Sequence, residues 1–404
     1  MKNKYDASHD YVEEEAQCQQ LSAKALDSTR ALLRFFRYLL LCILVLWLSL
    51  TVILNRDNIN MDNLRRLFAK IDIGVSSAKE EDGTQIELTY EEDVRVASFK
   101  DGLAHLTPSE LTVLDNQGTV FLKAQTGFGS PDLLTSDRYI VCYDRGGNKI
   151  LVTNSFAVVF EKKMPEKISY VTMSEQNYLA VITTGSGYKN SLYVYDSSFE
   201  EVFVWHSNER YLLSAAVSPD KKTVALTCYN VKEGNNTPEL VGIHLDEEQI
   251  AWETQLTGLP LDVCYKSGDN IALLYSDHLE FLNGKGKSER TYTFEKNFLQ
   301  GFVFDSEHTV LLLSGSKRGD STLYSINDRG KESAVYEVGS CVLGLDVREN
   351  RVALLDGENV CVYSLASKRV IDERKAPPGV QSVSFAGKNC LLDIYGTYCV
   401  YNEI

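Results

Sequence analysis

From residue 95 onward, the chain repeats one pattern of apolar and polar positions. An apolar run is followed by a polar turn, a second apolar run, and a third run that ends in a turn rich in Asp, Asn or Gly. From the first polar turn of the first copy, at Asp101, to that of the last, at Gly387, there are 286 residues in seven steps, about 41 residues per step. Short strands at this period predict an all-β β-propeller in which each blade is one four-stranded sheet. The first polar turns of the eight copies lie near Asp101, Asp137, Glu175, Asp220, Asp269, Glu307, Glu349 and Gly387.

The end of the chain predicts how the ring closes. The first seven copies are each followed by a fourth strand, whereas the eighth stops after three, at CVYNEI. The segment TQIELTYEE, residues 84–92, supplies the missing outer strand, because pairing the two ends removes an open sheet edge. We therefore predict an eight-bladed propeller over residues 84–404, with a seven-bladed ring as the alternative.

The connections between strands predict which face of the ring binds. If each blade runs from an inner to an outer strand, the second-to-third and fourth-to-first connections share one face. That face carries the longest loops, at 183–190, 229–239 and 314–321. Loops on a rigid scaffold carry recognition, and aromatic and Arg side chains are favoured at interfaces.

The predicted binding residues lie in or beside these loops. Trp205 has a competing interpretation, in which its ring packs within the sheets. The full set is Tyr188, Tyr229, Trp205, His206, Arg210, Lys317 and Arg318.

An uncharged apolar stretch precedes the repeats, at residues 38–55 (YLLLCILVLWLSLTVILN). A membrane-spanning helix needs about 20 apolar residues. Residues 31–33, Phe35 and Phe36 extend the apolar surface, while Arg34 and Arg37 can reach the headgroups. We predict a cytoplasmic tail at 1–30, a transmembrane signal anchor at 31–55, and a linker at 56–83 with a short amphipathic helix. A buried core helix and a cleaved signal peptide are the alternatives. The basic residues nearest the stretch favour a cytoplasmic N-terminus, so we expect a single-pass cell-membrane protein with an extracytoplasmic propeller.

Composition agrees with a soluble domain beyond this stretch. The formal net charge is −15, which argues against nucleic acid or anionic lipid as the main partner. Seven of the nine cysteines follow residue 56, mostly inside apolar runs. We expect free, buried thiols, although an oxidising compartment usually pairs its cysteines.

Two short motifs carry a family resemblance. YDRGG at 143–147 and VSPDKKTVAL at 217–226, together with the order of tail, anchor, short helix and propeller, resemble an uncharacterised family of bacterial membrane-anchored β-propellers, a domain of unknown function. Turns of the SPD type also occur in WD40-like and quinoprotein-like propellers. The resemblance implies a bacterial cell-surface protein and brings no catalytic residues.

The search for chemistry yields no catalytic motif. The six histidines are dispersed, and HExxH, GxSxG and P-loop patterns do not occur. The three tryptophans are too few for the repeated Trp of quinone-dependent propeller enzymes. We therefore expect no metal and no cofactor, and the sequence favours a binding protein over an enzyme.

Three functions remain open. The first is a membrane-anchored module that binds or scaffolds an envelope protein or a cell-wall polymer. The second is an envelope enzyme that acts on a glycan or peptide in a central-channel site. The third is a transmembrane sensor that signals through the N-terminal tail.

Overall fold

A computed structural model describes two compact units of the chain, Met1–Ser76 and Ser77–Ile404, and each is considered by itself. The described residues are 35–47, 49, 62, 65–66, 84–88, 93–185, 187–232, 235–247, 249–266, 268–295, 297–305, 308–315, 321–339, 342–394 and 397–401.

The first unit contains the predicted tail, the predicted anchor and most of the predicted linker. Residues 35–47 are helical and exposed, and residue 49 is helical too. Residues 62, 65 and 66 are helical, within the linker where a short helix is predicted. The tail at 1–30 and the rest of the anchor and linker of this unit lie outside the described residues. Within the described part of the chain, no helix is both long enough and apolar enough to span a membrane.

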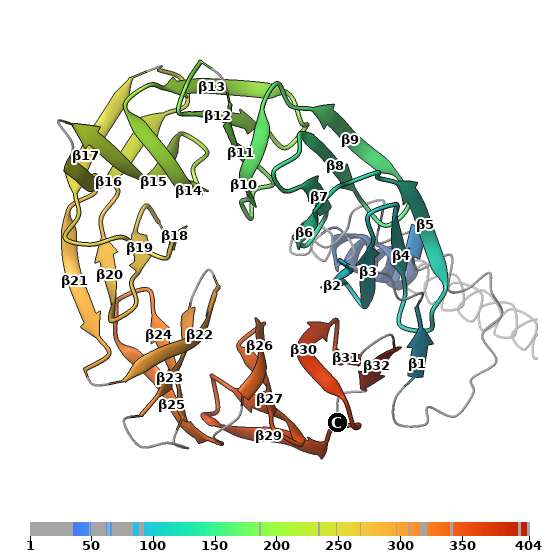
Figure 1. Ribbon diagram of the computed structural model, residues 1–404. Helices are drawn as coiled ribbons and strands as arrows, with labels where there is room; N and C mark the ends of the chain where they lie inside the picture. The colour runs from blue at the N-terminus through green and yellow to red at the C-terminus, as the bar shows by residue number, and fades with distance from the viewer. Residues whose placement is uncertain are drawn as a thin grey trace, which may run out of the picture. The chain divides into compact units, whose positions relative to one another are not determined.

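The second unit is all-β, as predicted. Its described residues form 32 strands in eight four-stranded sheets, in which every neighbouring pair is antiparallel. Seven sheets consist of four consecutive strands, and the eighth combines the last three strands with the first. Within this unit the sheets stand around a ring (Figure 1). In the seven consecutive sheets the first strand along the chain is innermost, and in the eighth sheet the innermost strand is the first of the last three.

The sheets are numbered here in chain order. Sheet 1 is β2 (Arg95–Phe99), β3 (Gly102–Leu106), β4 (Glu110–Leu114) and β5 (Val120–Gln125). Sheet 2 is β6 (Pro131–Thr135), β7 (Ile140–Asp144), β8 (Lys149–Thr153) and β9 (Val158–Lys163). Sheet 3 is β10 (Lys167–Met173), β11 (Leu179–Thr184), β12 (Asn190–Tyr195) and β13 (Glu201–Ser207). Sheet 4 is β14 (Arg210–Val217), β15 (Thr223–Lys232), β16 (Asn235–His244) and β17 (Ile250–Gln255).

The second half of the ring follows the same order. Sheet 5 is β18 (Asp262–Tyr265), β19 (Ile271–Leu274), β20 (His278–Leu282) and β21 (Ser288–Thr293). Sheet 6 is β22 (Phe298–Phe304), β23 (His308–Ser314), β24 (Ser321–Asn327) and β25 (Glu332–Val338). Sheet 7 is β26 (Val342–Arg348), β27 (Arg351–Asp356), β28 (Asn359–Ser364) and β29 (Arg369–Lys375). Sheet 8 is β30 (Val380–Ala386), β31 (Asn389–Ile394), β32 (Thr397–Tyr401) and β1 (Thr84–Glu87).

The pairing of β1 with β32 joins the two ends of the ring. Thr84 stands opposite Val400 and Glu87 opposite Thr397, which is the pairing predicted for the segment 84–92. Ile86 is 4% exposed and packs with Leu103, Leu114 and Leu391, so one side chain of β1 joins sheets 8 and 1. The innermost strands β30 and β2 also pack against each other.

The core lies between neighbouring sheets. One cluster, for example, joins Ile182 and Leu192 of sheet 3 to Leu226 and Val241 of sheet 4, all fully buried. Each sheet carries apolar residues on both of its faces, so one blade needs a neighbouring blade on either side to bury them.

Five cysteines of the second unit agree with the prediction of free thiols. Cys142, Cys228, Cys361 and Cys390 are buried and unpaired, and Cys264 is half-buried and unpaired. Burial raises the pKa of the Cys264 thiol to about 11, which leaves little reactive thiolate at neutral pH.

Candidate binding surface

One face of the ring bears the connections from second to third strand and from fourth to first strand; we call it the loop face. For the loop predicted at 183–190, β11 ends at Thr184 and β12 begins at Asn190; for the loop predicted at 314–321, β23 ends at Ser314 and β24 begins at Ser321. The prediction of a loop at 229–239 is wrong. β15 and β16 continue through Lys232 and Asn235, so this segment is the end of the longest hairpin. Cross-strand pairing here overrides the low strand propensity of Asn and Pro.

Tyr188 and His206 meet on the loop face of sheet 3. Their rings are stacked, with centroids 4.3 Å apart. His206 Nδ1 lies 2.8 Å from Ser191 Oγ, which lies 3.2 Å from a carboxylate oxygen of Glu166. The carboxylate can only accept, so Ser191 donates to Glu166 and accepts from His206 Nδ1–H. This chain of hydrogen bonds orients the imidazole of His206, whose side chain is exposed.

Arg210 is engaged inside sheet 4. Its Nε donates to Glu239 over 2.8 Å and its Nη2 donates to Glu253 over 2.7 Å. Asn230 Nδ2 donates to the other Glu239 oxygen over 3.0 Å. The guanidinium therefore ties β14 to β16 and β17, while its predicted role in binding stays a prediction.

The remaining predicted residues are placed differently. Trp205 lies in β13 and packs against the core between sheets 3 and 4, in line with its packing interpretation. Tyr229 is half-buried in β15. It pairs with Tyr211 of β14 on one side and with Pro238 of β16 on the other. Lys317 and Arg318 lie outside the described residues.

The loop face also carries a set of exposed apolar side chains that was not predicted from the sequence. They come from the starts of innermost strands, the connection before β18 and the loop after β11. Leu259 and Leu261 lie in the sequence TGLPLD, where the neighbouring Gly and Pro indicate a loop. Apolar residues in a loop were the sequence signal that could have predicted their exposure. We call this set the apolar arc: Tyr188 (39% exposed), Tyr211 (47%), Leu259 (40%), Leu261 (55%), Phe298 (67%) and Leu343 (51%).

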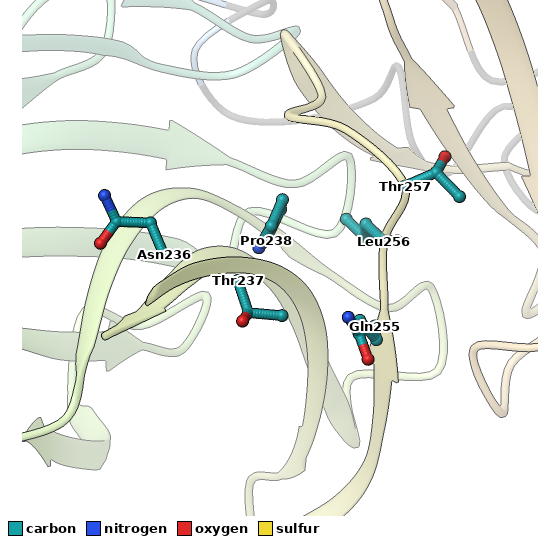
Figure 2. Close-up of a pocket in the computed structure, with 6 residues that line it drawn as sticks. All are labelled: Asn236, Thr237, Pro238, Gln255, Leu256 and Thr257. Carbon is teal, nitrogen blue, oxygen red and sulfur yellow. The ribbon is translucent and has the colours of Figure 1, made fainter. Parts of the chain in front are cut away.

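A shallow pocket of about 520 Å³ opens beside the long hairpin. Asn236, Thr237 and Pro238 form one side, and residues 255–257 at the end of β17 form the other (Figure 2). The ladder between β16 and β17 reaches Pro238, whose carbonyl accepts from the Leu256 amide over 2.9 Å. Proline has no amide hydrogen to continue the ladder, so the strands part there and the pocket forms.

Asp262 is a half-buried carboxyl at the start of β18. Burial raises the pKa of this carboxyl above its ordinary value, while the Val263 amide and the Tyr170 hydroxyl lower it. An acid with a raised folded pKa adds stability below its unfolded pKa and loses that contribution as pH rises through the folded pKa.

Asp262→Asn is therefore expected to raise the free energy of unfolding at neutral pH. The gain should disappear below a pH of about 3.9, where the carboxyl is protonated in both states. Urea unfolding at neutral and acidic pH measures this. Asp137→Asn, in an exposed turn, is the control. An equal effect of Asp262→Asn at both pH values would contradict the pKa argument.

The described residues hold no group of three or more His, Cys, Asp or Glu side chains arranged to bind a metal ion. The arrangements that the loop face does offer are aromatic, apolar and hydrogen-bonding.

Comparison with known proteins identifies a family and a fold. The family profile described as "Family of unknown function (DUF5711)" matches residues 76–392. No curated protein matches the chain. Among solved structures, BamB from Moraxella catarrhalis is 12% identical with a TM-score of 0.51, and the match covers 80% of this chain and 99% of that one.

Two further structures are similar. The C-terminal WD40 domain of Sif2 is 10% identical with a TM-score of 0.54, covering 80% of this chain and 98% of that domain. Sqt1 from Saccharomyces cerevisiae is 12% identical with a TM-score of 0.52, covering 79% of this chain and 99% of that one. At these identities the likeness shows the β-propeller fold alone.

Proposed function

The chain belongs to the DUF5711 family of unknown function, and from that premise we propose that it is a membrane-anchored, eight-bladed propeller that binds a partner protein through its loop face. The observation that carries this proposal is the apolar arc. Its members are 39% to 67% exposed and come from sheets 3 to 7 and the connections between them. Large apolar side chains gathered on one face mark an interaction site, and aromatic ones are the strongest anchors.

The rim of the ring is the competing surface. Exposed valines also occur on outer strands, for example Val158 and Val159 of β9, Val335 of β25 and Val370 of β29. They lie on the outer strands of sheets 1, 2, 3, 6 and 7, one or two to each of these sheets. Their aliphatic side chains lack the ring area of Tyr and Phe. The loop face offers larger side chains, a pocket and loops, which favours it as the binding surface.

The anchor and its orientation belong to the same proposal. The uncharged run at 38–55 supports a membrane helix at 31–55, with the tail in the cytoplasm and the propeller outside. The partner is then an envelope protein, which a propeller fixed to the membrane would hold at the cell surface.

A photo-crosslinking amino acid placed at Tyr211 or Phe298 of the full-length chain in cells tests the proposal. Both positions are expected to give the same discrete protein adduct, and Tyr188→Ser is expected to weaken it about tenfold, as loss of an aromatic anchor does. Val158 and Val370 on the rim are matched control positions, with 43% and 46% exposure.

Adducts that form at the rim positions and not at the loop face would overturn the choice of surface. Protease added to intact cells is expected to degrade the propeller. Full protection, with degradation after lysis, would overturn the outward orientation.

A further inference from the structure

A group of basic side chains stands out on the loop face of sheets 2 and 3, in a chain whose net charge is −15. Lys149 opens β8 and Lys163 ends β9, and the two stand directly opposite each other in the ladder. Lys167 opens β10, the next strand. All three are exposed. We call these three lysines the basic cluster.

Backbone hydrogen bonds hold the cluster's turns together. The Gly146 amide donates to the Ile168 carbonyl over 2.9 Å, and the Ile168 amide donates to the Gly147 carbonyl over 2.7 Å. The Met164 amide donates to the Asn148 carbonyl over 2.7 Å. The turn before Lys149 and the connection between Lys163 and Lys167 are therefore one connected surface.

Two of the acidic side chains nearby, those of Asp144 and Glu166, accept hydrogen bonds from other groups. Asp144 Oδ1 accepts from the amides of Gly129 and Ser130 over 2.9 and 2.8 Å. Glu166 accepts from the hydroxyls of Thr183 and Ser191. Glu161 is exposed on β9 and stands opposite Leu151 in the ladder. It lies two residues before Lys163, so the two side chains are on the same face of the strand.

The lysines themselves have no carboxylate partner in the described part of the chain. Lys149 Nζ donates to the carbonyls of Thr126 and Gly127, at 3.5 and 3.3 Å. Like charges placed directly opposite each other in a ladder are unfavourable. An anion bound between Lys149 and Lys163 would relieve this repulsion.

Aromatic surface adjoins the cluster. Glu166, which lies between Lys163 and Lys167 in the connection to sheet 3, is joined through Ser191 to His206, on which Tyr188 stacks. Lys189 lies with its ammonium 4.7 Å from the centre of the Tyr211 ring. The surface therefore offers positive charge and apolar rings side by side.

We infer that the basic cluster binds an acidic, extended peptide segment that also carries apolar side chains. This inference rests on the proposed function and names the chemistry of the partner. Carboxylates would pair with Lys149, Lys163 and Lys167, and apolar side chains would lie on Tyr188. A polyphosphate chain supplies the negative charge but nothing to cover the aromatic rings, so a peptide fits better.

The test uses the full-length chain in detergent and a labelled peptide of alternating Glu and Val. Fluorescence anisotropy is expected to show binding that weakens with added salt, because the charges are exposed. The triple variant Lys149→Gln, Lys163→Gln, Lys167→Gln is expected to bind about tenfold more weakly, as the loss of three exposed charge pairs implies. Lys222→Gln, Lys285→Gln, Lys287→Gln, exposed lysines in turns of the opposite face, form the matched control and should leave binding unchanged.

Equal binding by the triple variant and the wild type, or no binding by the wild type, would overturn the inference. Binding of inorganic polyphosphate in place of the peptide would overturn the choice of a peptide and point to an anionic polymer. If the triple variant forms the loop-face adduct from Tyr211 with the same yield as the wild type, this inference fails while the proposed function stands. Absence of that adduct from the wild type would overturn the proposed function itself.

Discussion

Arg210→Ala is expected to lower the free energy of unfolding of the propeller by about 3 kcal/mol. The Arg210 side chain is 10% exposed and that of its partner Glu239 is 14% exposed. Removing the guanidinium leaves the Glu239 carboxylate with one remaining donor, Asn230, in a site that excludes most water. Breaking a buried pair by removing one partner costs more than the pair contributes, because the other charge stays buried. Urea unfolding of the full-length chain measures the change.

Two companion variants separate this explanation from a general packing loss. Glu253→Gln touches the same guanidinium, but the Glu253 side chain is 59% exposed, so its cost should stay below about 1 kcal/mol. Arg210→Met combined with Glu239→Gln removes both charges and should recover part of the loss. A double variant no more stable than Arg210→Ala would mean that shape, not charge, determines the effect.

Ile86→Asp is expected to lower the free energy of unfolding by at least about 3 kcal/mol. Replacing a buried Ile by a small residue already costs roughly 2–5 kcal/mol, and an unpaired carboxylate adds a desolvation penalty. Ile86 is the buried side chain of β1 between sheets 8 and 1, so the substitution should also release β1 from β32 and expose a sheet edge. Urea unfolding and limited proteolysis after β1 follow the two effects.

Gln85→Asp is the matched control for Ile86→Asp. Gln85 is the neighbouring residue on the same strand and is exposed, so the same charge should change stability by less than about 0.5 kcal/mol. If Ile86→Asp unfolds at the same urea concentration as the wild type, the pairing of the two chain ends contributes little to the ring.

The two variants also bear on function, because the proposed partner surface depends on the ring. The loop face is assembled from separate sheets, and its apolar arc spans sheets 3 to 7. Arg210 stands next to Tyr211, a member of that arc. Loss of the Arg210 ion pairs is therefore expected to disturb the start of β14 as well as the stability of sheet 4.

The candidate site could be predicted only in part. Tyr188 and His206 were predicted as binding residues because they stand in or beside a Gly-rich loop. The structure stacks their rings, and their role in binding stays a prediction. Trp205, one position earlier, points into the core between sheets 3 and 4. Successive residues of a strand face opposite sides, but the sequence does not say which side the next sheet covers. Phe298 and Tyr211 escaped notice for the same reason, since apolar residues that open a strand usually belong to a core.

The sequence by itself determined the repeat, the all-β architecture and the closing role of residues 84–87, because strand length, alternation and the missing fourth strand are local properties of the chain. It also predicted free, buried thiols, and Cys142, Cys228, Cys361 and Cys390 are buried and unpaired. Only the tertiary structure decided that Lys149 faces Lys163, that Arg210 is enclosed by two glutamates, and that the apolar arc stays uncovered. Each of these depends on the register between strands or the contact between sheets, and neither is encoded in the order of residues along a single strand.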